Sequence, residues 1–312
     1  MPLHPMIAAM VEQRQTLGVP GLSDGTPDEA RAMLAAGREA LGAGPDMAST
    51  ADVDIPGRSR PIPARILVPP GDVVGVIVYL HGGGWVVGAV DEFDTLGRTL
   101  AGATQCAVVL PDYRLAPEHP FPAGLEDAED AITWVASGAV PGVASSLPLI
   151  VAGDSAGGNL VTVATRHLRD VVHPVLQVLI YPVTDSEFDT SSYQEHAEGL
   201  PLTRRDMTWF FTHYAPEDQW ASPDISPSRA GDLAGLPSTL VLTAEHDVLR
   251  SDGERYAELL AAAGVPTTYR SYPDVTHGFV RMHNVLDVAR DAIADIAGAV
   301  DTAVSAVRSA PI

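Results

Sequence analysis

The chain of 312 residues is long enough for one large α/β domain with a lid, and 19 basic against 40 acidic side chains give it a net charge of −21. All of the cations are arginines, which excludes mechanisms that need a lysine, such as a Schiff base with pyridoxal phosphate. Nucleic acids and anionic membranes bind to clustered cations, so the acidic balance argues against both as partners. No window reaches the ~18 unbroken apolar residues of a membrane span, and the first residues lack the pattern of a secretory signal. We therefore expect a soluble, cytoplasmic protein.

The predicted elements change character along the chain. Two helical segments, at 6–17 and 27–41, come before any strand. Short β runs begin near residue 51, and after them apolar strands alternate with helical segments. Such alternation predicts a mostly parallel sheet with helices on both faces, with residues 1–312 forming a single domain. The expected strands are 51–56, 61–69, 73–80, 106–110, 149–153, 175–182, 238–244 and 267–273, and the later helices are 123–137, 159–169, 251–263 and 284–307.

The run 106–110, CAVVL, contains the only cysteine of the chain, Cys106. A single cysteine forms no internal disulfide, and its apolar neighbours predict a buried strand residue with an unreactive thiol.

One insertion breaks this alternation between residues 183 and 222. It contains a polar loop and an aromatic helix around Trp209, Phe210 and Phe211. Together with residues 1–45 it could form a cap over the carboxyl ends of the strands, which would exclude water from a site below. The alternative is an ordinary surface insertion whose aromatic side chains pack only against its own underside.

The stretch PLIVAGDSAGGNL, residues 148–160, reads as a strand, a sharp turn and a helix. Gly153 and Gly157 flank Ser155 in the spacing G-x-S-x-G. Small neighbours allow a serine to occupy a strained turn that pushes its hydroxyl clear of the backbone. We interpret the stretch as a nucleophile elbow with Ser155 as the nucleophile.

A second chemical motif, HGGGW, starts at His81 directly after the apolar strand 73–80. Acyl transfer places negative charge on the carbonyl oxygen of the substrate, and backbone N–H groups aimed at that oxygen lower the barrier. Glycine allows close approach of the backbone, so we assign Gly83 and Gly84, with the amide of Ala156, to an oxyanion hole. For His81 we expect a hydrogen bond that holds the loop, not proton transfer.

A serine needs a base, and the base needs an acid that orients it. On this kind of fold they follow in the chain order serine, acid, histidine. Among ten histidines, position selects His277, which lies in a loop after the last predicted strand. The acid should follow the strand before it, which makes Asp247 the first choice and Asp252 the second.

The runs HGGGW, DYRLAPEHPFPAGLEDA, GDSAGGNL, AEHDVLRSDG and HGF together resemble the bacterial hormone-sensitive-lipase family (family IV) of α/β-hydrolase carboxylesterases over residues 50–300. The resemblance implies an eight-stranded sheet, a helical cap, and hydrolysis of short- to medium-chain acyl esters through an acyl-enzyme intermediate, without metal or cofactor. It also implies Ser155, Asp247 and His277 as the triad. The family's acid usually stands in a D-P-L-R-D-E-G-like segment, where this chain has Val248 and Ser251 in place of the proline and one carboxylate. Members often pair through the edge strand, here 267–273, so a homodimer is a further expectation.

Several assignments stay open at this stage. An amidase or another acyl hydrolase would use the same triad, and a non-catalytic binding protein exists on this fold in the plant gibberellin receptors. A dehalogenase would need a carboxylate where Ser155 stands. For the walls of the substrate pocket we name four apolar residues, with core packing as the alternative for each: Trp85, Trp209, Phe210 and Leu249.

Overall fold

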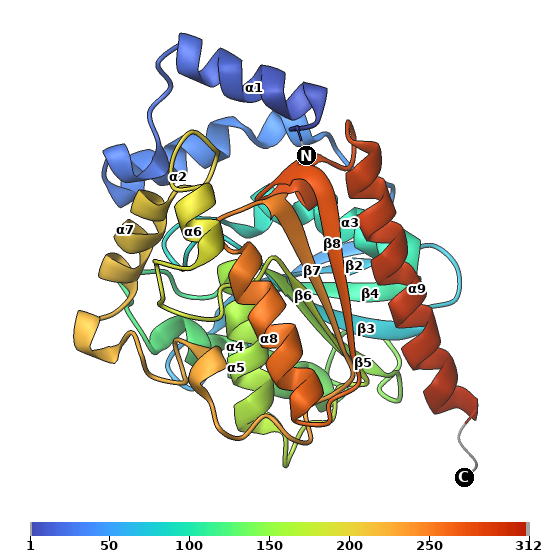
Figure 1. Cartoon of the computed structure of the whole chain (residues 1–312). Helices are drawn as coiled ribbons and strands as arrows, with labels where there is room; N and C mark the ends of the chain where they lie inside the picture. Colours follow the sequence, from blue (N-terminus) through green and yellow to red (C-terminus); the bar gives the residue numbers. More distant parts are fainter. Residues whose placement is uncertain (1, 310–312) are drawn as a thin grey trace.

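The computed structural model describes residues 2–309, and its centre is an eight-stranded sheet (Figure 1). The strand order is β1-β2-β4-β3-β5-β6-β7-β8. The two pairs at one edge, β1 with β2 and β2 with β4, are antiparallel, and all later pairs are parallel. The sheet is therefore mostly parallel, as predicted. The strands are β1 (Ser49–Ile55), β2 (Ile62–Val68), β3 (Gly75–Leu80), β4 (Cys106–Pro111), β5 (Leu149–Asp154), β6 (Leu176–Ile180), β7 (Thr239–His246) and β8 (Thr267–Thr276).

Two layers of helices cover the sheet. α3 and α9 contact each other and pack on one face, whereas α4, α5 and α8 pack on the other (Figure 1). Every residue of β3, β4, β5 and β6 is buried, which explains the continuous apolar runs that predicted central parallel strands. The helices are α1 (Pro5–Thr16), α2 (Pro27–Ala36), α3 (Val90–Thr104), α4 (Ala123–Ala136), α5 (Ala156–Leu168), α6 (Ser191–Glu195), α7 (Arg204–Tyr214), α8 (Arg250–Ala262) and α9 (Asp287–Ser309).

Several helices differ from the sequence-based expectation. α3 was not predicted, because its glycines lower helix propensity. Gly97 is nevertheless required by the packing, since a Cβ there would lie 2.8 Å from Leu67 Cδ1 of the sheet. The segment expected as one helix at 27–41 divides into α2 and a 3₁₀ helix, Arg38–Leu41, and the elbow helix begins at Ala156, three residues before the predicted start.

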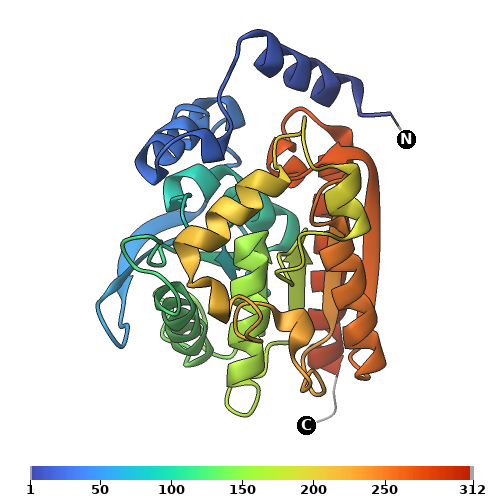
Figure 2. The same cartoon turned by 60° about the vertical axis from the view of Figure 1, so that its left-hand side comes forward.

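The N-terminal segment and the insertion lie together at the carboxyl end of the parallel strands, where Figures 1 and 2 show α1, α2, α6 and α7. Asp206 of α7 accepts hydrogen bonds from the amide and the hydroxyl of Ser23, at 3.0 and 2.6 Å. Asn159 of α5 donates to the carbonyls of Val183 and Ile225, at 3.0 and 2.8 Å, and so joins the start of the insertion to the segment that follows it. Two segments far apart in sequence thus share one surface above the sheet.

The remaining expectations concern single features. Cys106 is fully buried in β4, as predicted, and burial raises the pKa of its thiol to about 11. In the described part of the chain, no helix is long and apolar enough to cross a membrane. β8 forms one edge of the sheet, while pairing of two copies through it stays a prediction. The ends of the predicted single domain, residue 1 and residues 310–312, lie outside the described residues.

Candidate active site

Ser155 occupies the sharp turn between β5 and α5. Its backbone has φ 54° and ψ −120°, a region that costs a non-glycine residue roughly 1–3 kcal/mol. The flanking glycines are required by close contacts. A Cβ on Gly157 would lie 2.0 Å from the carbonyl oxygen of Leu80, and one on Gly153 would lie 2.5 Å from the backbone of Gly157. Packing of the elbow against β3 therefore maintains the strained turn.

The structure brings the three predicted triad residues into one chain of hydrogen bonds. Oγ of Ser155 lies 3.0 Å from Nε2 of His277, and Nδ1 of His277 lies 2.7 Å from Oδ2 of Asp247. Asp247 follows β7 and His277 follows β8, so the two side chains meet at the carboxyl edge of the sheet. This arrangement can move a proton from the serine to an imidazole whose other nitrogen faces a carboxylate.

The loop that presents Asp247 is held firmly despite its unusual sequence. Oδ1 of Asp247 accepts a hydrogen bond from the amide of Leu249 at 3.0 Å. Ser192 of α6 donates its hydroxyl to the carbonyl of Val248 at 2.6 Å and accepts the amide of Ser251 at 3.1 Å. The insertion thus supports the segment in which Val248 and Ser251 depart from the family pattern.

Asp252, the second choice for the acid, lies elsewhere. Its side chain is buried, and Oδ2 accepts the amides of Thr184 and Asp185 at 2.9 and 3.0 Å. Burial raises the pKa of this carboxyl group to about 8. Asp252 therefore organises the start of the insertion, and the hydrogen bond to His277 belongs to Asp247.

The predicted oxyanion hole has backbone amides that are available to a ligand. In residues 2–309, none of the amides of Gly83, Gly84 and Ala156 donates a hydrogen bond, whereas the amide of Gly82 is bound to Oδ1 of Asp154 at 2.8 Å. Gly83 and Gly84 have φ values of 126° and 57°. A Cβ would lie 2.1 Å from the carbonyl oxygen of Val87 at the first position and 2.2 Å from the ring of Phe210 at the second. Ala156 begins α5, so its amide also carries the positive end of the helix dipole.

Two buried polar side chains hold this loop in place, one of which the sequence analysis did not identify. Asp154, next to the nucleophile, accepts the Tyr79 hydroxyl and the Gly82 amide with the same oxygen, both at 2.8 Å. His81 places Nδ1 2.8 Å from the carbonyl of Gly82, and burial lowers the pKa of its ring to about 4. His81 is therefore neutral near pH 7 and lies in the loop-holding position expected for it.

Tyr181 is a second residue that the sequence analysis missed. It is fully buried at the end of β6 with φ 36°, and its ring centroid lies 4.5 Å from that of His277. The Tyr181 ring supports one side of the imidazole. An aromatic residue near the end of a predicted apolar strand was the signal in the sequence.

The four residues named for the pocket wall occupy different environments. Trp85, 1% exposed, stacks on Tyr214 with ring centroids 4.2 Å apart, and Leu249 is fully buried. Both lie in the packed interior, the alternative stated for them. Phe210 covers Gly84 of the oxyanion loop. Trp209 is half-buried on the same helix.

A cavity of about 700 Å³ lies between the N-terminal segment and the insertion. Its lining includes Val11 and Arg14 of α1 on one side, and Leu200 and Arg204 on the other. The triad residues are not part of this lining, so the cavity is a feature of the upper surface and not of the elbow itself.

Comparisons with known proteins agree with this geometry. The profile of a family described as alpha/beta hydrolase fold matches residues 77–281. Carboxylesterase NlhH of Mycobacterium tuberculosis is 41% identical over 239 residues, which cover 74% of this chain and 75% of the relative. The ethyl acetate hydrolase of Pseudomonas putida is 37% identical over 241 residues, 74% of this chain and 76% of that protein. The solved structure of a hyperthermophilic esterase from the archaeon Pyrobaculum calidifontis superposes with a TM-score of 0.91 at 39% identity, covering 97% of this chain and 100% of the other.

Proposed function

Because the chain belongs to the family of α/β-hydrolase-fold carboxylesterases, we propose that it hydrolyses carboxylic esters of small molecules with Ser155 as nucleophile, His277 as general base and Asp247 as orienting acid. The observation that carries this assignment is the continuous chain of contacts from the serine hydroxyl through the imidazole to the carboxylate, at 3.0 and 2.7 Å. The protein is a serine hydrolase, and the roles of the individual residues are our proposal.

The first half-reaction forms an acyl-enzyme. Oγ of Ser155 attacks the ester carbonyl while Nε2 of His277 takes the hydroxyl proton, and Asp247 stabilises the imidazolium that results. The oxyanion of the tetrahedral intermediate accepts hydrogen bonds from the amides of Gly83, Gly84 and Ala156. His277 then donates its proton to the leaving alcohol. In the second half-reaction the same imidazole activates water, which releases the acid and regenerates Ser155.

We propose esters of short- to medium-chain acids as the substrates. Ser155 is only 6% exposed, and Phe210 of α7 lies directly over Gly84. A bulky acyl group must therefore displace a packed aromatic ring, whereas a small one does not. We assign the role of the cap to residues 1–45 and 183–222, whose described parts lie at this end of the sheet.

An ester-to-amide comparison tests the proposal. We expect turnover of p-nitrophenyl esters to be highest for short and medium acyl chains and to fall for long ones, with much slower cleavage of p-nitroanilides of the same acids. Cleavage of the anilides at the rate of the esters would establish an amidase. Binding of esters without turnover would establish the non-catalytic class, although such a protein has no need of a complete triad.

A further inference from the structure

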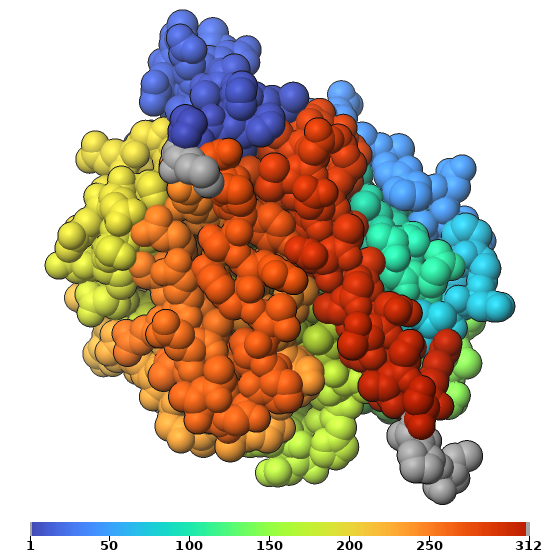
Figure 3. Space-filling view, turned by 45° about the vertical axis from the view of Figure 1, so that its right-hand side comes forward, coloured from blue at the N-terminus to red at the C-terminus, as the bar shows by residue number. Residues whose placement is uncertain are grey.

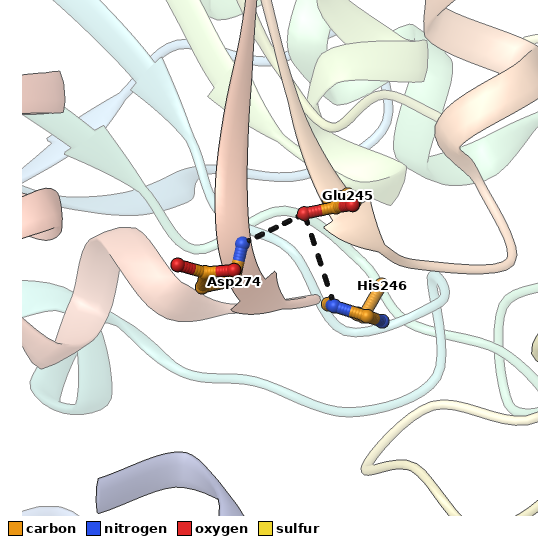
Figure 4. A group of neighbouring side chains, drawn as sticks. All are labelled: Glu245, His246 and Asp274. Carbon is orange, nitrogen blue, oxygen red and sulfur yellow. Dashed lines mark hydrogen bonds and ion pairs between the residues drawn. The ribbon is translucent and has the colours of Figure 1, made fainter. Parts of the chain in front are cut away.

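A group of ionisable side chains lies at the ends of β7 and β8, apart from the hydrogen-bond chain of the triad. Glu245 and His246 end β7, and Asp274 lies near the end of β8 (Figure 4). One potential ligand atom from each residue lies within 4.8 Å of the other two. The sheet has an irregularity between Ala244 and His246, and a bulge of this kind turns neighbouring side chains toward the same side. The backbone thus directs an imidazole and two carboxylates to one point.

Two atoms of this group are buried and lack a hydrogen-bond partner in the described part of the chain. They are Nε2 of His246 and Oδ1 of Asp274. A buried polar atom without a hydrogen-bond partner destabilises a protein, and Nε2 of His246 lies 3.8 Å from the carboxylate of Glu245. The third residue, Glu245, is bonded to the backbone of β8: its Oε2 accepts a hydrogen bond from the amide of Asp274 at 2.9 Å. A ligand that bridges these atoms would compensate for their burial.

The surrounding residues hold the group in place. The carbonyl of Glu245 accepts Nε2 of His196 and Nη1 of Arg250, both at 3.1 Å. The ring of His196 also packs edge-on against the ring of His246, with centroids 5.4 Å apart. These contacts fix the backbone of Glu245 and one side of the His246 ring.

We propose that Glu245, His246 and Asp274 bind a divalent cation of the Zn²⁺ class. One imidazole nitrogen and two carboxylate oxygens form a ligand set that zinc accepts, with bonds of roughly 2.0–2.2 Å and water at the remaining position. Bonds of that length bring the ligand atoms to about 3.5 Å from each other, so binding requires the three partly buried side chains to rotate toward one another.

The position of the site indicates a structural role. Glu245 and His246 directly precede Asp247, and Asp274 precedes His277 by three residues. A cation held by all three would join the ends of the two strands that present the acid and the base of the triad. Binding would therefore stabilise the folded protein by linkage, independently of ester hydrolysis.

Zinc titration of the full chain, after chelator treatment, tests the proposal by isothermal titration calorimetry and by thermal unfolding. We expect one tight site per chain and a rise of several degrees in Tm at saturating zinc. His246→Gln and Asp274→Asn should each weaken binding at least about tenfold and reduce the rise in Tm at the same zinc concentration. Asn tolerates the left-handed backbone at position 274, where φ is 63°, so Asp274→Asn keeps the test valid if His246→Gln fails to fold.

The chain offers a matched control in His167. It also lies between two carboxylates, but both of its nitrogens already contact oxygens, at 2.7 Å from Glu129 and 2.9 Å from Asp224. His167→Gln should therefore leave the zinc affinity unchanged. Absence of zinc binding by the wild-type chain would overturn the proposal. So would equal affinity in the wild type and in folded His246→Gln or Asp274→Asn, since zinc would then bind elsewhere.

Discussion

The elbow region and helix α1 differ in how closely they are packed against the rest of the protein. At the elbow, Ser155 is 6% exposed and each flanking glycine lies too close to backbone atoms to accept a side chain. α1 has twelve residues and buries only Ile7, while Met10 and Leu17 are 45% and 68% exposed. Figure 3 shows this N-terminal segment as a projection from the body. The groups at the elbow are therefore fixed by close packing, whereas α1 has few buried contacts with the body.

The rest of the cap lies between these two extremes. Arg31 of α2 donates to the carbonyls of Val86 and Ala116 at 2.9 Å and forms an ion pair with Glu118 at 2.7 Å. α7 places Phe210 directly on the oxyanion loop. Substrate preference should thus depend most on α7, which contacts the loop of Gly83 and Gly84 through Phe210, and least on α1.

Substitution of the nucleophile is the strongest test of the packed region. Ser155→Ala should lower kcat by about 10⁴-fold or more, because the remaining groups bind substrate without forming an acyl-enzyme. Steady-state kinetics with a p-nitrophenyl ester measures the effect. The exposed Ser137, whose hydroxyl donates to the carbonyl of Trp134, provides the control, and Ser137→Ala should keep wild-type turnover. Comparable rates in both variants would remove Ser155 from the mechanism.

Substitutions of the two candidate acids, Asp247 and Asp252, should distinguish a role in catalysis from a role in holding the insertion. Asp247→Asn should lower kcat by about 10³–10⁴-fold, since the amide no longer stabilises the imidazolium. Asp252→Asn should change kcat only slightly, because its carboxyl group is already protonated near pH 7 and an amide oxygen can accept the same two backbone bonds. A greater loss of kcat in Asp252→Asn than in Asp247→Asn would exchange the two roles.

The contact between cap and oxyanion loop can be tested with a pair of substitutions. Gly84→Ala places a Cβ 2.2 Å from the ring of Phe210, and we expect a loss of about 10²-fold in kcat as the donor moves. Adding Phe210→Ala removes the clash, so the double variant should regain about tenfold over Gly84→Ala. Gly298→Ala, where nothing lies within 4 Å of the added Cβ, is the control. No recovery in the double variant, with Phe210→Ala alone remaining folded and active, would show that the clash is not the cause.

The smallest expected effect concerns stability away from both regions. The hydrogen bond to Glu129, reinforced by Asp224, raises the pKa of His167. Its folded pKa thus exceeds the unfolded value of about 6.5, so its contribution is complete below that value and is lost as pH rises through the folded pKa. Because the His167 side chain is partly exposed, the free energy of unfolding of the wild type should exceed that of His167→Gln by only about 0.5–1 kcal/mol at acidic pH. Urea unfolding across a series of pH values from about 5.5 to about 9 measures this difference. A difference that does not shrink as the pH rises would contradict a raised pKa of His167.

The sequence predicted those parts of the site that depend on local motifs and strand order. Ser155, Asp247 and His277 each follow a parallel strand, and parallel strands end at one edge of a sheet, so their proximity could be anticipated. Support from distant segments could not. Ser192 is one hydroxyl in a polar insertion, and its contact with the loop after Asp247 appears only once the insertion folds over the sheet.

The same limit applies to the interior of the cap. Trp85 was named for the pocket wall with core packing as the alternative, and its ring stacks on Tyr214 from the insertion. An aromatic residue near a motif has the same sequence signal in a core as in a pocket. α3 was missed for a related reason, since Gly97 weakens the helical pattern while serving the packing against β2.

The most direct test of the central claim is covalent labelling with a serine-directed p-nitrophenyl phosphonate, followed by intact and peptide mass spectrometry. We predict one phosphonyl group per chain, located on Ser155 with release of p-nitrophenol, and no adduct on Ser155→Ala. Labelling of His277→Ala should be strongly slowed, because the serine hydroxyl then lacks its base. An adduct on any other residue, or equally rapid labelling of the wild type and His277→Ala, would contradict the triad.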